Sequence, residues 1–224
     1  MRPIHTMLGI ALAFGMAGAA AAAYAGDEMH MGMNMDMSHM DMSGGAGTDP
    51  HAHHHHMEQQ KVTRMTADYS VPQIRLVRDD NHTVSLPDEM NDGRPVILNF
   101  IYTACTAVCP ITSRTFEQLQ DMLGNDRDKV HMISITIDPE QDTPERLSAY
   151  ARKYDAKSQW RFYTGSSEAS LAAQRAFDVY HGDKMNHAPV TLLRAAPGQS
   201  WLRIDGFASA DELLGEYRKL VHAP

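Results

Sequence analysis

The stretch YTACTAVCPI, residues 102–111, contains the only two cysteines of the chain, Cys105 and Cys109. Side chains four residues apart in a regular helix have Cβ atoms about 5–6 Å apart, whereas a disulfide prefers about 3.5–4.5 Å. Two thiolates that share one soft metal ion tolerate the wider gap, and Cu(I) favours sulfur ligands. The pair is therefore a candidate both for copper binding and for dithiol–disulfide chemistry.

Two explanations without a chemical function remain for the cysteine pair: both thiols are buried and inert, or they form a structural disulfide. A disulfide between residues four apart closes a very small loop and constrains little of the unfolded chain. A purely structural bridge would therefore contribute little stability.

The elements around the cysteines determine their environment. The apolar run PVILNFIY, residues 95–102, predicts a buried strand that leads directly into the pair. After Pro110, apolar residues recur with helical spacing up to Gly124. The cysteines thus lie where a strand turns into a helix, and unpaired N–H groups at a helix N-terminus can lower a cysteine pKa from about 8.5 to roughly 3.5–7.5.

The rest of the chain alternates strands and helices. Capping is expected from Asp142 with Glu145 in one helix, and from Ser209 or Asp211 in the last. We expect a hairpin from 73–77 and 83–86, strands at 130–138 and 160–165, helices at 142–154 and 167–180, a hairpin from 189–195 and 200–206, and a closing helix at 208–221. This order predicts an α/β, thioredoxin-like fold in which helices flank a central mixed β-sheet, with an N-terminal β-hairpin.

A histidine is the natural third ligand for a copper ion held by two thiolates. His181 and His187 both lie in the loop YHGDKMNHAP before the apolar VTLL segment. In a thioredoxin-like arrangement the loop that enters this strand passes beside the dithiol, which favours His187. A solvated loop histidine is the alternative.

Three stretches carry a family resemblance: NFIYTACTAVCPITSRTFEQL, ISITIDPEQDTPERLSAYA and NHAPVTLL. They resemble the Sco/SenC copper proteins, which assist assembly of the copper-A centre of cytochrome c oxidase, and the likeness covers residues 69–221. The resemblance implies one copper bound by Cys105, Cys109 and His187, and redox catalysis by the same two cysteines. It also implies that Asp138 lies near the metal, although Asp138 could be a simple turn residue.

The chain departs from the family pattern at two places. Thr106 and Ala107 stand where the family commonly has Pro-Asp, and Asn186 stands where an Asp often precedes the histidine. The loss of two carboxylates predicts a retuned copper affinity or redox potential, and leaves open a client other than the oxidase.

The segment 26–66 is rich in Met, His and Asp and reads as a disordered, copper-binding tail. Thioether sulfur and imidazole nitrogen are both copper ligands. The alternative for the whole segment is a flexible spacer without a binding role. The alternative for the histidine run is an engineered tag. The candidate ligands are Met29, His30, Met31, Met33, Met35, Met37, His39, Met40, Met42, His51, His53, His54, His55 and His56.

Residues 1–25 read as a secretory signal peptide, with a basic start, an apolar middle and the motif AYA before Gly26. We expect an exported, periplasmic protein that is soluble after cleavage and peripheral to the membrane at most. A membrane anchor formed by the uncleaved segment is the alternative. The formal net charge of −8 argues against nucleic acid as a partner.

These features predict a copper metallochaperone whose domain, residues 67–224, delivers copper to the copper-A subunit of cytochrome c oxidase or to another copper-receiving protein. Two alternatives remain: a thiol–disulfide oxidoreductase that reduces client cysteines, which would need only Cys105 and Cys109, and a copper-buffering or resistance protein that relies on the tail.

Overall fold

The computed structural model describes residues 62–222. The predicted signal peptide, 1–25, and nearly all of the predicted tail, 26–66, lie outside the described residues. Within the described part, none of the helices has the length and apolar character needed to cross a bilayer.

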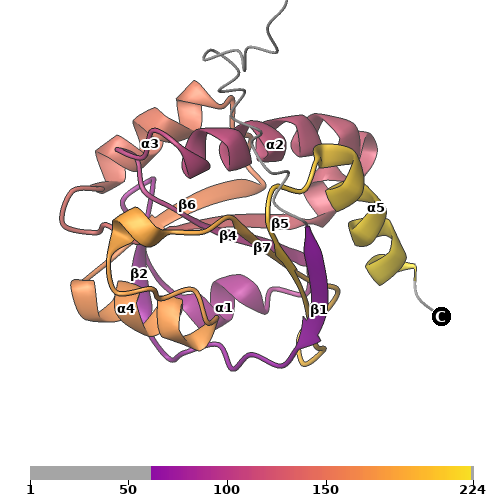
Figure 1. Ribbon diagram of the computed structural model, residues 1–224, viewed down its shortest axis with the longest axis horizontal. Coiled ribbons are helices and arrows are strands. Elements are labelled where there is room, and N and C mark those ends of the chain that lie inside the picture. The colour runs from indigo at the N-terminus through magenta and orange to yellow at the C-terminus, as the bar shows by residue number, and fades with distance from the viewer. Residues whose placement is uncertain (1–61, 223–224) are drawn as a thin grey trace, which may run out of the picture. The chain divides into compact units, whose positions relative to one another are not determined.

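A mixed sheet of eight strands, in the order β1-β8-β7-β4-β5-β6-β2-β3, forms the centre of the domain (Figure 1). Strand β4 is parallel to β5, and β5 to β6, whereas the other neighbours are antiparallel. The strands are β1 Thr63–Ala67, β2 Arg75–Arg78, β3 Thr83–Ser85, β4 Val96–Ile101, β5 His131–Thr136, β6 Trp160–Thr164, β7 Val190–Arg194 and β8 Trp201–Asp205.

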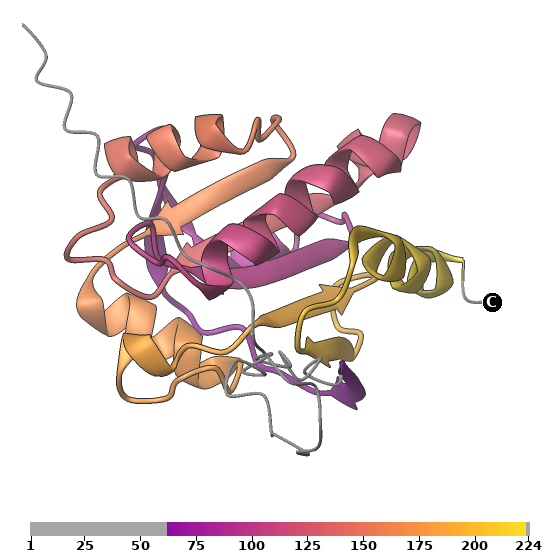
Figure 2. The same ribbon diagram turned by 45° about the horizontal axis from the view of Figure 1, so that its top comes forward.

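Helices cover both faces of the sheet (Figures 1 and 2). One core cluster joins α2, α3 and α5 to the strands, and a second cluster joins α1 and α4 to the opposite face. The helices are α1 Leu86–Met90, α2 Val108–Leu123, α3 Pro144–Lys153, α4 Ser167–Ala176 and α5 Ala210–Val221, with short 3-10 helices η1 Gly124–Lys129 and η2 Lys184–Asn186.

Strand β4 shows why the sequence before the cysteines is continuously apolar. Ile97 and Ile101 pack in the cluster of α2, α3 and α5, whereas Leu98 and Phe100 pack in the cluster of α1 and α4. All six residues of β4 are buried, because alternate side chains meet helices on opposite faces. The strand thus forms a rigid base from which the cysteine turn projects.

The predicted α/β class, mixed sheet and flanking helices are confirmed, as are the hairpins β2–β3 and β7–β8. The expected boundary of the tail at residue 66 is wrong, because Thr63–Ala67 forms β1 and pairs along β8. Hairpin β2–β3 is therefore not the first element. The sequence pattern of β1 is weak because four of its five residues are exposed. The position of the strand depends on backbone pairing with β8 and on ion pairs from Arg64 to Glu212 and Glu216.

Helix α5 begins as predicted, with a capping box between Ser209 and Glu212. The expected cap of α3 is wrong. Thr143 is the N-cap, and its hydroxyl accepts the Arg146 N–H at 3.4 Å. Asp142 is instead fully buried one residue earlier, where it accepts three hydrogen bonds, described below, from two threonines.

Candidate metal and redox site

The two cysteines lie at the N-terminus of α2, just beyond the end of β4. Cys109 is in the first turn of the helix, and its backbone N–H donates to Cys105 Sγ at 3.3 Å. Ala107, at the N-cap, has no side chain that could accept this bond. The Cys105 sulfur therefore takes the position of a capping acceptor, and both cysteines are free thiols.

The environments of the two thiols differ. Burial opposes ionisation of Cys105, but hydrogen bonds from the N–H groups of Cys109 and Ala107, from the Cys109 side chain and from the Tyr102 hydroxyl outweigh it and lower the Cys105 pKa. Burial raises the pKa of Cys109 well above its usual range. Of the two sulfurs, Cys105 therefore loses its proton more readily.

Tyr102 connects β4 to the cysteines. Its carbonyl accepts the Cys105 N–H at 3.1 Å, and its hydroxyl lies 3.8 Å from Met185 Sδ. Burial, followed by the interaction of its hydroxyl with the neighbouring Cys105 sulfur, raises the pKa of Tyr102 to about 12. Tyr102 thus stays protonated at neutral pH and can donate to a Cys105 thiolate.

Asp142 anchors the cysteine turn to the neighbouring strand. It accepts the Thr103 N–H at 3.0 Å and the Thr103 hydroxyl at 2.5 Å. It also accepts the Thr136 hydroxyl at 2.5 Å. This buried carboxylate therefore ties the loop before Cys105 to the end of β5.

His187 ends the loop that leads into β7, beside the end of β4. Its Nε2 lies 2.9 Å from the carbonyl oxygen of Phe100, and its side chain is buried. Because a carbonyl can only accept, Nε2 carries the proton and Nδ1 keeps a lone pair. Burial lowers the pKa of His187, so the ring is neutral at pH 7.

The structure brings Cys105 and Cys109 together, and it places His187 against their shared neighbour. The rings of His187 and Tyr102 meet edge to face, with centroids 6.5 Å apart. Nowhere in residues 62–222, however, do three His, Cys, Asp or Glu side chains converge closely enough to hold a metal ion. The ligand set of Cys105, Cys109 and His187 therefore stays a prediction.

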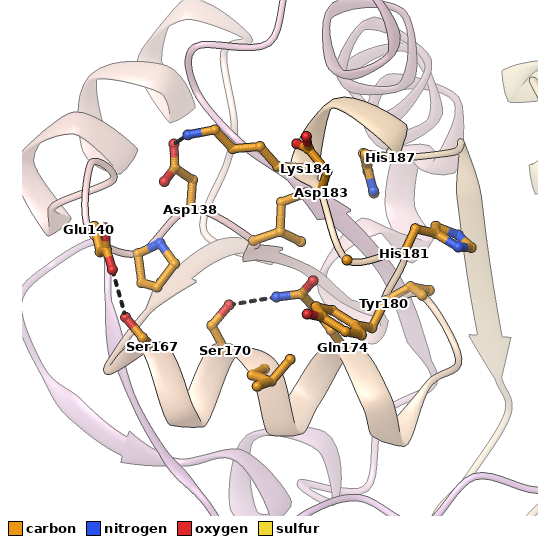
Figure 3. A pocket seen from close by; sticks show the side chains of 15 residues that line it. Asp138, Glu140, Ser167, Ser170, Gln174, Tyr180, His181, Asp183, Lys184 and His187 are labelled. Carbon is orange, nitrogen blue, oxygen red and sulfur yellow. Dashed lines mark hydrogen bonds and ion pairs between the residues drawn. The ribbon is translucent and has the colours of Figure 1, made fainter.

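Asp138 and the other loop histidine, His181, lie on the side of His187 shown in Figure 3. Asp138 is buried and pairs with Lys184 Nζ at 2.6 Å, so it fastens the loop that carries His187. His181 is exposed. A direct role of Asp138 toward a metal stays a prediction.

A cavity of about 610 Å³ opens beside this loop (Figure 3). It is formed by the segment after β5, by α4 and by the loop itself, and the two cysteines are not among its lining residues. Its polar lining includes Asp138, Glu140, Ser170, Gln174, His181 and Lys184. His187 thus forms part of the wall between this cavity and the Tyr102 ring.

Sequence reasoning missed three residues around the site: Tyr102, Asp142 in its anchoring role, and Met185, whose Sδ lies 3.8 Å from the Tyr102 hydroxyl. Tyr102 directly precedes the cysteine turn, and Met185 stands two residues before His187. Both positions could have been singled out by their proximity to predicted ligands. The role of Asp142 carried no such signal, because it depends on two threonines from other segments.

Comparison with known proteins places these observations in a family. The SCO1/SenC family model matches residues 62–222. The SCO1 protein homolog of Bacillus subtilis is 31% identical over 105 residues, which are 46% of this chain and 53% of the relative. The chain thus spans about half the length of this relative.

Two solved structures show the same fold. The copper-bound ScoI of Arabidopsis thaliana has 24% identity and a TM-score of 0.57 over 67% of this chain and 97% of that one. BsSco, described as a member of the Sco family of cytochrome c oxidase assembly proteins with a disulfide switch, has 24% identity and a TM-score of 0.59 over 71% of this chain and 98% of that one. Since the family model spans every described residue, from β1 to the end of α5, this chain belongs to the SCO1/SenC family.

Proposed function

We propose that this chain is an exported copper metallochaperone that binds one copper ion through Cys105, Cys109 and His187 and delivers it to a copper-A type centre of cytochrome c oxidase. Membership of the SCO1/SenC family supports this function. So do the copper bound in the Arabidopsis homologue and the oxidase-assembly role ascribed to the family of BsSco.

The observation that carries the proposal is the pairing of two sulfurs at the N-terminus of α2. Cys105 is the acceptor of the Cys109 N–H, and its pKa is lowered. Two sulfurs with one imidazole form a soft ligand set that suits Cu(I). Cys109 must lose its proton when metal binds, so uptake of copper releases a proton.

The protonation state of the His187 ring is the one that a metal ligand needs. Metal-bound histidines commonly donate their other ring N–H to a carbonyl or carboxylate, which fixes the tautomer. The Nε2–H of His187 donates to the Phe100 carbonyl, leaving Nδ1 unprotonated. Because three ligands do not converge in the described residues, binding requires a shift of the loop that Asp138 and Lys184 hold.

An anaerobic copper titration followed by absorption spectroscopy tests the site. We expect a thiolate-to-copper charge-transfer band in the full chain, its loss in Cys105→Ser and Cys109→Ser, and a marked weakening or shift in His187→Ala. His181→Ala is the matched control, since His181 lies in the same loop and is exposed. Equal spectra of His187→Ala and the wild type would remove His187 from the ligand set.

We also propose that the Met/His-rich tail recruits copper for the folded site. Its thioethers and imidazoles supply ligands for both copper oxidation states. Deletion of residues 26–61 should reduce the number of copper ions bound per chain without loss of the thiolate band. Equal stoichiometry with and without the tail would contradict this role.

Reduction of a client disulfide is the second candidate, and the unequal pKa values of the two thiols favour it. The Cys105 thiolate would attack one client sulfur and release the other as a thiolate. Cys109 would then lose its proton, attack the Cys105 sulfur and release the first client sulfur. The client gains two thiols as Cys105 and Cys109 form one disulfide.

The two functions differ in their need for His187. In His187→Ala, single-turnover reduction of insulin disulfides should persist if thiol exchange is the activity, whereas delivery of copper to an acceptor should collapse. In Cys105→Ser both activities should be lost.

A further inference from the structure

Met185 presents a thioether at the surface of the loop that carries His187. Among residues 62–222 the exposed methionines are Met65 and Met185, and Met185 is the more exposed, at 72%. It lies in η2, between the exposed His181 and the buried His187. An exposed methionine adds nothing to the core, but its sulfur is a soft metal ligand that does not titrate.

The loop holds this thioether in a defined place. The Asp183 side chain accepts the Met185 N–H at 2.9 Å and so caps η2. The ion pair between Lys184 and Asp138 fastens the adjacent residue to the end of β5. These two contacts fix the backbone of η2, from which the Met185 side chain projects.

Tyr102 connects Met185 to the cysteine turn. The Tyr102 hydroxyl lies 3.8 Å from Met185 Sδ, and the Tyr102 carbonyl accepts the Cys105 N–H at 3.1 Å. A thioether sulfur has two lone pairs, so one stays available to a metal ion while the other accepts from the Tyr102 hydroxyl. Only Tyr102 thus separates the exposed Met185 sulfur from the predicted cysteine ligands.

We propose that Met185 is the ligand that first receives Cu(I) at the protein surface, before the ion passes to Cys105 and Cys109. A Cu–S bond to Met185 forms as a donor ligand leaves, and it breaks when the Cys105 sulfur binds, with copper remaining Cu(I) throughout. This inference rests on the proposed function, since it assumes that the cysteines are the destination. It adds a residue outside the predicted ligand set.

The trapping experiment uses the full chain with ¹³C-methyl methionine and replaces both cysteines, Cys105→Ser with Cys109→Ser, so that the ion cannot move on. Cu(I) is added anaerobically until the other methionine methyl signals stop moving. We expect the Met185 signal, assigned by its loss in Met185→Leu, to shift. The Met65 signal, assigned in the same way, should stay in place.

A kinetic experiment with intact cysteines measures the role of Met185 in transfer. In stopped flow, the ultraviolet Cu(I)–thiolate absorption should appear several-fold more slowly in Met185→Leu than in Met65→Leu or the wild type. Leucine keeps the size and apolar character of methionine, so only the sulfur is lost.

The outcomes separate the two proposals. If the wild type forms the thiolate absorption but the Met185 methyl stays unshifted and Met185→Leu reacts as fast as Met65→Leu, Met185 is not a copper ligand and the proposed function stands. If the wild type forms no Cu(I)–thiolate absorption, the proposed function itself fails.

Discussion

At the scale of single residues, the site shows how the local environment gives two thiols different pKa values. Cys105 and Cys109 are four residues apart, yet hydrogen bonds lower the pKa of the first and burial raises the pKa of the second. The cause is local: Cys105 faces the free N–H groups of α2, whereas Cys109 is fully buried under the helix. The sulfur that ionises more readily is therefore the one closer to the surface.

This asymmetry predicts selective alkylation. With iodoacetamide, the rate at Cys105 should rise with pH through a lower midpoint than the rate at Cys109. Since each unit of pKa separation changes the thiolate fraction about tenfold at a given pH, Cys105 should react more than about tenfold faster at pH 7. Peptide mass spectrometry reads both sites, and equal rates would contradict the assignment.

The N-cap position offers a second prediction. In Ala107→Asp a carboxylate next to Cys105 disfavours its thiolate by charge repulsion and competes for the same N–H groups. The Cys105 pKa should rise, and its alkylation midpoint should move to higher pH. Ala107→Asn is the matched neutral control and should shift the midpoint less; a larger shift in Ala107→Asn than in Ala107→Asp would show that charge is not the cause.

At the scale of elements, the site depends on how loops are fastened to the ends of the strands. Asp142 links the turn after β4 to the end of β5, and the pair of Asp138 with Lys184 links β5 to the loop before β7. Both carboxylates follow β5. The segment after this strand thus positions the cysteine turn on one side and the His187 loop on the other.

Removal of the buried carboxylate should therefore be costly. Asp142→Ala leaves one N–H and two hydroxyls without their acceptor, and we expect a loss of about 3 kcal/mol in the free energy of unfolding. Urea denaturation measures this loss. The exposed Asp121→Ala on α2 should change stability by no more than about 0.5 kcal/mol.

Asp142→Ala should also loosen the turn before Cys105, so that the buried Cys109 becomes easier to alkylate. Unchanged stability together with unchanged alkylation of Cys109 would mean that the three hydrogen bonds do not hold the turn in place.

At the scale of the whole molecule, the domain closes its sheet with a strand that precedes the predicted globular region. Strand β1 pairs with β8 along all five residues, and Arg64 reaches Glu212 and Glu216 on α5. Val62 packs against the core cluster of α2, α3 and α5. Residues 62–67 therefore belong to the folded domain, and β1 protects the β8 edge from pairing with other chains.

Truncation tests where the domain begins. A chain that starts at Asp68 should lose on the order of 2 kcal/mol of stability, which lowers the melting temperature by roughly 4–8 °C. A chain that starts at Lys61 should melt as the full chain does. Differential scanning calorimetry measures both melting temperatures. Equal values for the two truncated chains would show that β1 contributes no stability.

The sequence by itself determined most of the strand–helix order and the placement of Cys105 and Cys109 at a helix start, because both depend on local periodicity. His187 became a candidate through its residue type and its expected place in a thioredoxin-like fold. It did not reveal β1, whose mostly exposed residues are placed by backbone pairing with a strand about 140 positions later. Only the tertiary structure decided that the buried Asp142 anchors the cysteine turn and that burial raises the pKa of Cys109. It also decided that Tyr102 contacts Cys105, Met185 and His187. These facts depend on contacts between distant segments, which side-chain burial and long-range hydrogen bonds determine and local sequence pattern does not encode.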